Sequence, residues 1–314
     1  MRRAGVLVVL ALAASLLAAI VPSSGASADI AAPIAPNSGL PGSTCQGVPL
    51  GTTFVPPGAG ITTTGLGPDA PAYYEVGSTT GAFAGKPPKG IMIVIHGGGW
   101  YVVGKQTLVS LRPYVDHWRA RGWQTVSIDY RGCSQSIGDV LWFMQRIRQL
   151  RPNAVICASG ISAGGHLALL LASVRKDLAC AISMAGPSDL AALAQQQAYD
   201  PVLGLLSPVR PTRLFNGAVA AFGASPSPLI FNSPIAYVAY VKARILLVGG
   251  EHDPIIPAEQ NANYAAALKA AQPNAYVDTT LLPVGSLPFV HSGISQTGMD
   301  DLNARELALV APFG

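Results

Sequence analysis

The chain has 314 residues, of which 50% are hydrophobic and 11% are charged. This composition is typical of a globular protein with a large apolar core, and it excludes an intrinsically disordered chain. The formal net charge of +4 at pH 7 is too small to indicate binding to nucleic acid.

The first 28 residues have the three-part pattern of a secretory signal peptide. Arg2 and Arg3 precede an uncharged run over residues 4–21, and a small, polar stretch then ends at Ala28. We expect cleavage after Ala28 and an extracytoplasmic mature protein. An uncleaved membrane anchor is the alternative, because the run is long enough to span a bilayer. No later stretch is apolar enough for a second span, so no stable membrane span is expected after cleavage.

Residues 29–71 are rich in Gly, Pro, Ser and Thr, and we expect an extended arm that lies on the domain formed by residues 72–314. In that domain, short apolar runs alternate with longer helical patterns. This alternation predicts an α/β fold with a mostly parallel central sheet and helices on both of its faces. The stretch 186–242 interrupts the alternation and is expected to form a small lid-like insertion at one end of the sheet.

Strands are expected at residues 91–95, 124–130, 154–159, 179–185, 245–249 and 279–282. Helices are expected at residues 108–121, 137–150, 164–175, 257–271 and 299–310. Pro113 should kink or delay the first of these helices.

Four cysteines are compatible with an oxidising compartment, although four thiols permit three pairings. Cys157 and Cys180 fall within apolar, strand-like runs, where we expect buried free thiols. A bridge between Cys45 and Cys133 is the preferred pairing. No paired Cys or His spacing suited to a metal occurs, so we expect neither a metal nor another cofactor.

A candidate nucleophile lies in Gly160-Ile-Ser-Ala-Gly164, between an expected strand and an expected helix. Small residues flank Ser162 as a sharp strand-to-helix turn requires. In such a turn the Ser162 hydroxyl projects from the edge of the sheet, beside a helix N-terminus that favours negative charge. A glycine-rich connection with an incidental serine is the alternative interpretation.

The second motif, His96-Gly-Gly-Gly-Trp100, directly follows the expected strand 91–95. Three glycines leave backbone N–H groups unobstructed, so Gly97 and Gly98, together with Ala163, are candidates for an oxyanion hole. His96 is expected to form hydrogen bonds within its own loop. A phosphate-binding loop would need a different glycine pattern, which the sequence lacks.

A serine hydroxyl needs a neighbouring base, and the sequence has five histidines. In the order serine, acid, histidine, the base must lie after the acid, and this excludes His96, His117 and His166. His252 is a formal rival that adjoins the candidate acid. His291 alone follows every candidate acid, in a loop after the last expected strand.

Asp253 is the candidate acid, because it follows the strong apolar strand 245–249. A carboxylate at this place would orient the imidazole and stabilise its charged form. Glu251 and Asp278 are the alternatives. Asp253 could instead serve only as a turn or helix cap before Pro254.

Taken together, these motifs resemble the esterases of the hormone-sensitive-lipase-like group, and more closely the acetyl-xylan and feruloyl esterase-like branch of the α/β hydrolases. The resemblance covers about residues 91–293 and implies the α/β-hydrolase fold, with Ser162, Asp253 and His291 as the triad. It likewise implies oxyanion-hole N–H groups at Gly97, Gly98 and Ala163. The sequence stretches that carry it are His96–Trp100, Ser127-Ile-Asp-Tyr-Arg131, residues 160–168, Asn232-Ser-Pro-Ile235 and residues 253–257.

Two departures distinguish this chain from those relatives. Ile161 stands where hormone-sensitive-lipase relatives usually carry an acidic residue, and the loop before His291 lacks the usual Gly-His pair.

The expected activity is that of a secreted serine carboxylesterase acting through an acyl-enzyme on small-molecule esters with short to medium acyl chains. An acyltransferase or a peptidase on the same fold is an alternative, because a triad does not choose the acceptor or the bond. A catalytically silent, secreted binding protein is the alternative from another class. The sequence does not determine the alcohol part of the substrate or the oligomeric state.

Overall fold

The computed structural model describes residues 48–49, 56–199, 222, 226–251, 253, 255–283 and 296–313. All of them belong to one unit, Ile34–Gly314. The signal segment, Cys45, the residues 200–221 of the insertion, His252 and His291 lie outside the described residues.

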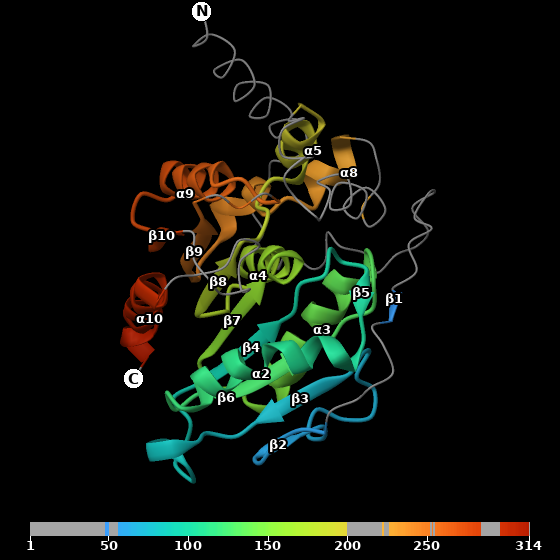
Figure 1. Ribbon diagram of the computed structural model, residues 1–314, viewed down its shortest axis with the longest axis vertical. Coiled ribbons are helices and arrows are strands. Elements are labelled where there is room, and N and C mark those ends of the chain that lie inside the picture. The colour runs from blue at the N-terminus through green and yellow to red at the C-terminus, as the bar shows by residue number, and fades with distance from the viewer. Residues whose placement is uncertain are drawn as a thin grey trace, which may run out of the picture. The chain divides into compact units, whose positions relative to one another are not determined.

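Eight strands form the central sheet within the described part of the chain (Figure 1). The pairs from β10 to β6 are parallel, whereas β3 pairs antiparallel with both β6 and β2. In spatial order the strands are β10 (Val277–Leu282), β9 (Arg244–Gly250), β8 (Cys180–Met184), β7 (Ile156–Ile161), β4 (Ile91–Ile95), β6 (Gln124–Ile128), β3 (Tyr74–Gly77) and β2 (Ile61–Thr62).

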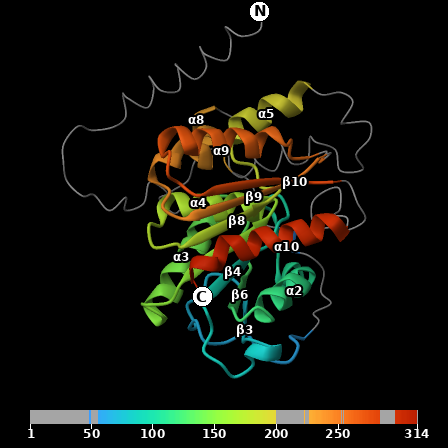
Figure 2. The same cartoon turned by 90° about the vertical axis from the view of Figure 1, so that its left-hand side faces the viewer.

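Alternation along the strands creates two apolar layers, because successive side chains of a strand point to opposite faces. Ile91, Ile93 and Ile95 of β4 join one core cluster, whereas Met92 and Val94 join the other. The first cluster includes buried residues of α3 (Gln135–Leu150), α4 (Ala163–Val174) and α9 (Glu259–Ala271). The second includes residues of α2 (Lys105–Arg119) and α10 (Gln296–Val310), which share one face of the sheet (Figure 2).

Shorter elements complete the described chain. They are β1 (Val48–Pro49), which pairs with β5 (Val102–Val103), η1 (Gly81–Phe83), α5 (Leu190–Tyr199), α8 (Pro226–Phe231), η2 (Pro234–Tyr240) and η3 (Ala311–Phe313). The stretch between β8 and β9 therefore contains α5, α8 and η2, in the place where the sequence indicated an insertion. None of the helices in the described part of the chain has the length and apolar character needed to cross a bilayer.

All six expected strands and all five expected helices are present, with ends that differ by a few residues. The expected delay at Pro113 is wrong: α2 begins at Lys105 and continues through the proline. Strand β3 was not expected from the sequence, and its Tyr-Glu-Val-Gly sequence places the buried Glu75 in the sheet. Glu75 is accommodated because Arg112 of α2 donates to its carboxylate at 2.7 Å.

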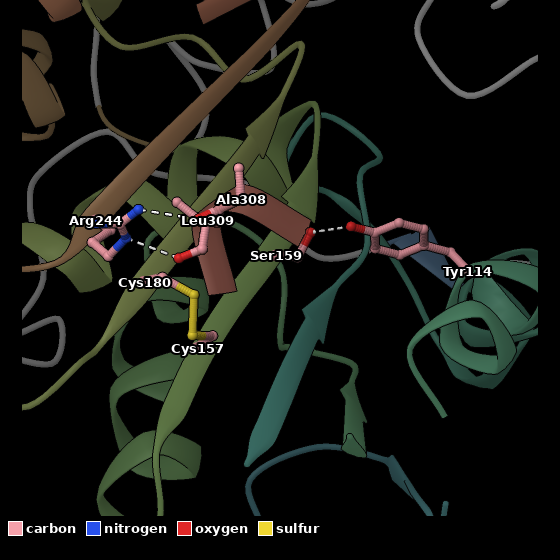
Figure 3. The surroundings of a disulfide bond; sticks show 7 residues. All are labelled: Tyr114, Cys157, Ser159, Cys180, Arg244, Ala308 and Leu309. Atoms are coloured by element: carbon pink, nitrogen blue, oxygen red, sulfur yellow. Dashed lines mark hydrogen bonds between the residues drawn. A yellow bond between two sulfur atoms is a disulfide. The ribbon is translucent and has the colours of Figure 1, made fainter. Parts of the chain in front are cut away.

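Cys157 and Cys180 form a disulfide, so the expectation of free thiols there is wrong (Figure 3). The two residues are direct partners in the register of β7 and β8, and this alignment brings their Cα atoms to 4.6 Å. Cys133 is also disulfide-bonded. Cys45 is the one remaining cysteine of the sequence, and it lies outside the described residues.

Candidate active site

Ser162 occupies the sharp turn between β7 and α4. Its backbone has φ 53° and ψ −123°, a conformation that non-glycine residues rarely adopt and that the surrounding structure must enforce. The Ser162 N–H donates to the carbonyl of Met184 in β8 at 2.8 Å, which fixes the turn to the neighbouring strand. The serine is 7% exposed and therefore lies in a partly closed site.

The small residues around Ser162 are required by close backbone contacts. A Cβ at Gly160 would collide with the carbonyl of Gly164, and a Cβ at Gly164 would collide with the carbonyl of Ile95. Only hydrogen atoms fit at these two positions, so α4 can begin directly against β7 and β4. The structure thus gives a physical reason for the glycine spacing around Ser162.

The glycine loop after β4 lies against this turn. A Cβ at Gly97 would stand 2.9 Å from the Ile161 carbonyl oxygen and 3.1 Å from the Cβ of Ser162. Gly98 has φ 117°, which favours glycine over residues with a side chain. Ala163 is the first residue of α4, and N–H groups of a first helical turn have no partner within the helix. Gly97 and Ala163 are therefore both next to the nucleophile.

A buried hydrogen bond between His96 and Asp129 holds the base of the glycine loop. The His96 Nε2 atom lies 3.0 Å from Asp129 Oδ1, and the His96 ring stacks on Tyr130 with centroids 4.1 Å apart. Asp129 also accepts the N–H of Gly104 at 3.0 Å, so it joins the two ends of the loop. The Tyr130 hydroxyl donates to the His96 carbonyl at 3.1 Å. His96 is thus occupied within its own loop, as expected.

A second anchor uses His166 of α4. Its Nδ1 accepts the indole N–H of Trp100 at 3.1 Å, and its Nε2 donates to the carbonyl of Asn232 at 2.7 Å. Burial lowers the pKa of His166 from 6.5 to about 4, so the ring is neutral at neutral pH. Phe222 packs edge-on against Trp100, with ring centroids 5.3 Å apart. His166 therefore fixes the glycine loop to α4 and to the insertion.

Asp253 is the buried carboxylate among the candidate acids. It follows β9, is 8% exposed, and its Oδ1 accepts the N–H groups of Ile255 at 2.8 Å and Ile256 at 3.0 Å. Glu251 is exposed. Asp278 is paired in register with Leu246, near the opposite end of β9, and forms an ion pair with Arg305 at 2.6 Å. Asp253 is the one of the three that is both buried and beyond the carboxyl end of β9.

The structure does not place the candidate base His291, nor its rival His252, because both lie outside the described residues. Of the excluded histidines, His117 contacts Glu306 of α10 at 2.6 Å. That glutamate is fully buried and accepts the Tyr114 hydroxyl, which also contacts Ser159 of β7 (Figure 3). His117 is therefore part of a structural network between helices α2 and α10.

Sequence reasoning missed Asp129 and Asn232 as anchors of the loop, although both lie in stretches that carry the family resemblance. Their roles depend on His96 and His166, which are 33 and 66 residues away. No group of His, Cys, Asp and Glu side chains suited to a metal occurs in the described part of the chain. The arrangement can supply a buried serine oxygen, adjacent backbone N–H groups and a buried carboxylate beyond the carboxyl end of β9.

Comparisons with known proteins give the family and the fold of the chain. The model of a family described as BD-FAE matches residues 83–268. A search of curated proteins gave no match.

Among solved structures, a hyperthermophilic esterase from Pyrobaculum calidifontis is 16% identical with a TM-score of 0.61, covering 77% of this chain and 83% of its own. A hormone-sensitive lipase from a metagenome library is 18% identical with a TM-score of 0.61, covering 82% and 87%. A bifunctional GH43-CE protein from Bacteroides eggerthii is 18% identical with a TM-score of 0.58, and the match covers 79% of this chain and 38% of that protein. At these identities the solved structures establish the fold alone, and they confirm the expected α/β-hydrolase fold.

Proposed function

Because the family model covers more than half of the sequence, the chain belongs to the BD-FAE family of α/β-hydrolase esterases and is a serine hydrolase of carboxylic esters, and we propose that Ser162, Asp253 and His291 form its catalytic triad. The observation that carries this proposal is the strained, buried turn at Ser162, packed against Gly97. Asp253 is supported by its burial beyond β9. His291 is supported by its position in the sequence, because it follows both Ser162 and Asp253.

The proposed reaction is a two-step acyl transfer to water. His291 removes the proton of the Ser162 hydroxyl as the oxygen attacks the ester carbonyl, and a tetrahedral oxyanion forms. The imidazolium returns that proton to the departing alkoxide, which leaves as the alcohol and gives the acyl-enzyme. His291 then deprotonates a water molecule that attacks the acyl carbonyl, and the carboxylic acid departs as Ser162 regains its proton. Asp253 orients the imidazole and stabilises its charged form.

We assign the oxyanion hole to the backbone N–H groups of Gly97, Gly98 and Ala163. These donors would act where negative charge develops, and they are held in place before the substrate arrives. The hydrogen bond between His96 and Asp129 and the hydrogen bonds of His166 support this assignment, because they fix the loop from two sides. The proposed chemistry requires no cofactor.

Short to medium acyl chains are the proposed substrates. A comparison of rates across a series of acyl chain lengths tests this preference. We further propose that residues 1–28 direct secretion. The disulfide between Cys157 and Cys180 supports an oxidising compartment.

The proposal is tested with p-nitrophenyl esters from acetate to palmitate. Ser162→Ala and His291→Ala should each lower kcat by roughly 10⁴-fold or more, while Ser110→Ala, at a surface serine of α2, should leave it unchanged. The wild-type rate should fall below about pH 6.5, because the base acts as a neutral imidazole. If the wild-type protein hydrolyses none of these esters, the catalytically silent binding protein is supported instead. If an added alcohol becomes acylated while the rate of hydrolysis declines, the protein is an acyltransferase.

A further inference from the structure

A recess separate from the candidate active site lies between α3 and the loop that joins β2 to β3. We call it the Trp142 recess, and its volume is about 260 Å³. Its walls are formed by Leu66, Asp69, Trp142, Gln145, Arg146 and Gln149. None of these residues belongs to the turn at Ser162, to the glycine loop or to the strand end that carries Asp253.

The geometry of α3 aligns one wall of the recess. Trp142, Gln145, Arg146 and Gln149 are spaced three and four residues apart, so they form one stripe on the helix surface. The opposite wall is the loop at Leu66 and Asp69.

Hydrogen bonds between the two walls keep the recess in shape. The Arg146 Nε–H donates to the Leu66 carbonyl at 2.7 Å, and the Leu66 N–H donates to the hydroxyl of Tyr74 at 3.0 Å. Gly67 has φ 101°, and a Cβ there would lie 3.1 Å from the Arg146 guanidinium. Glycine therefore lets the loop approach α3 closely.

Several polar groups of the recess have no partner among the residues that the structure describes. Within the described chain, the Trp142 indole N–H, the Asp69 carboxylate and the Gln145 amide make no hydrogen bond to another residue. The Arg146 Nη1 reaches the Gln149 amide oxygen at a long 3.5 Å. The recess thus offers donors and acceptors beside a partly buried indole ring.

Charge and polarity restrict the class of ligand. Four of the six lining side chains are charged or carry an amide, so an apolar molecule would leave them unsolvated. An anion would face Asp69 and a cation would face Arg146, so a neutral ligand has the smallest electrostatic cost. The volume is below the roughly 300 to 1,000 Å³ of sites for larger organic ligands, which indicates a single ring.

From this combination we propose that the Trp142 recess binds one pyranose ring of a neutral glycan. The apolar C–H face of a pyranose would stack on the Trp142 indole, which is an aromatic ring with a polar N–H. Its hydroxyl groups both donate and accept, so they match the Asp69 carboxylate, the two glutamine amides and the Arg146 guanidinium. The site would attach the protein to a glycan surface independently of the reaction at Ser162.

The experiment is a calorimetric titration of the full chain with two neutral probes, xylohexaose and cellohexaose. We expect at least one probe to bind, with a Kd on the order of 1 mM. Trp142→Ala and Gln145→Ala should each weaken binding by roughly tenfold or more. Gln135→Ala is the matched control, since Gln135 is an exposed glutamine of the same helix outside the recess, and it should bind as the wild type does.

Hydrolysis of p-nitrophenyl acetate should be unchanged in all three variants, and this readout shows that they are folded. The proposal is wrong if neither probe binds the wild type, or if Trp142→Ala and Gln145→Ala bind a probe as well as the wild type, because the probe then occupies another site. Failure of ester hydrolysis in every protein, with probe binding that depends on Trp142, would overturn the proposed catalytic function and leave this proposal standing.

Discussion

Gly97 lies directly against Ser162, and a Cβ at residue 97 would stand 3.1 Å from the Cβ of the serine. The same atom would stand 2.9 Å from the carbonyl oxygen of Ile161. A side chain at Gly97 must therefore displace either the glycine loop or the turn that carries the nucleophile. This contact links the proposed oxyanion donors to the nucleophile through the backbone itself.

We predict that Gly97→Ala lowers kcat for p-nitrophenyl acetate by about 100-fold, because loss of one aligned oxyanion donor has an effect of this size. Gly138→Ala is the matched control. A Cβ at Gly138 meets no atom within 4 Å, and alanine favours the helix α3 in which it lies. The oxyanion assignment would be contradicted if both alanine variants kept the wild-type rate.

Asp253→Asn should lower kcat by roughly 10⁴-fold, since an amide at this place supports the wrong imidazole tautomer. The replacement keeps an oxygen that can accept the N–H groups of Ile255 and Ile256, so the local turn should persist. Asp278→Asn serves as the comparison, because Asp278 pairs with Arg305 away from the site. Steady-state rates of the two variants decide between the candidates. A large loss in Asp278→Asn with little change in Asp253→Asn would reverse the assignment of the acid.

His166 should make the protein less stable in acid. Its pKa is lowered by burial from 6.5 to about 4, so between these pH values the unfolded chain binds a proton that the folded chain does not. The free energy of unfolding therefore has its full value above pH 6.5. It decreases as the pH falls toward 4, by roughly 3 kcal/mol in total.

His166→Gln tests this effect, since a glutamine amide can still accept from Trp100 and donate to Asn232 without titrating. Urea unfolding between pH 7 and pH 4 should show a shallower loss of stability in the variant. Parallel curves for the two proteins would show that His166 is not responsible.

The disulfide between Cys157 and Cys180 should stabilise the fold. The two residues are separated by 23 positions in sequence, and closing a loop of this length lowers the entropy of the unfolded chain by an amount worth roughly 3 kcal/mol. We predict that the double variant Cys157→Ala, Cys180→Ala unfolds at a lower urea concentration, and that its free energy of unfolding is smaller by about that amount. Unchanged stability under non-reducing conditions would mean that the bond does not form in the purified protein.

Local patterns explain why most of the fold could be predicted. The central strands are nearly continuous apolar runs, and the turn at Ser162 is specified by glycines within two positions of it. β3 was missed because the buried Glu75 interrupts its pattern, and Glu75 is accommodated there by Arg112, which lies 37 residues later. The Cys157–Cys180 bridge depends on the register between β7 and β8, which the spacing of the cysteines does not reveal.

The anchors of the candidate site were harder to predict for the same reason. His166 meets Trp100 and Asn232 only because the fold brings three distant stretches together. The sequence identified these residues as parts of recurring motifs, but it carried no local signal of how they pair. Long-range polar contacts of this kind require the three-dimensional structure.

Covalent labelling reports whether Ser162 is the nucleophile. The purified wild-type protein is incubated with a fluorophosphonate, digested, and analysed by mass spectrometry, with Ser162→Ala treated in parallel. We expect one adduct per chain, on the peptide that contains Ser162, and no adduct on the alanine variant. An adduct on another serine, or equal labelling of the variant, would contradict this expectation.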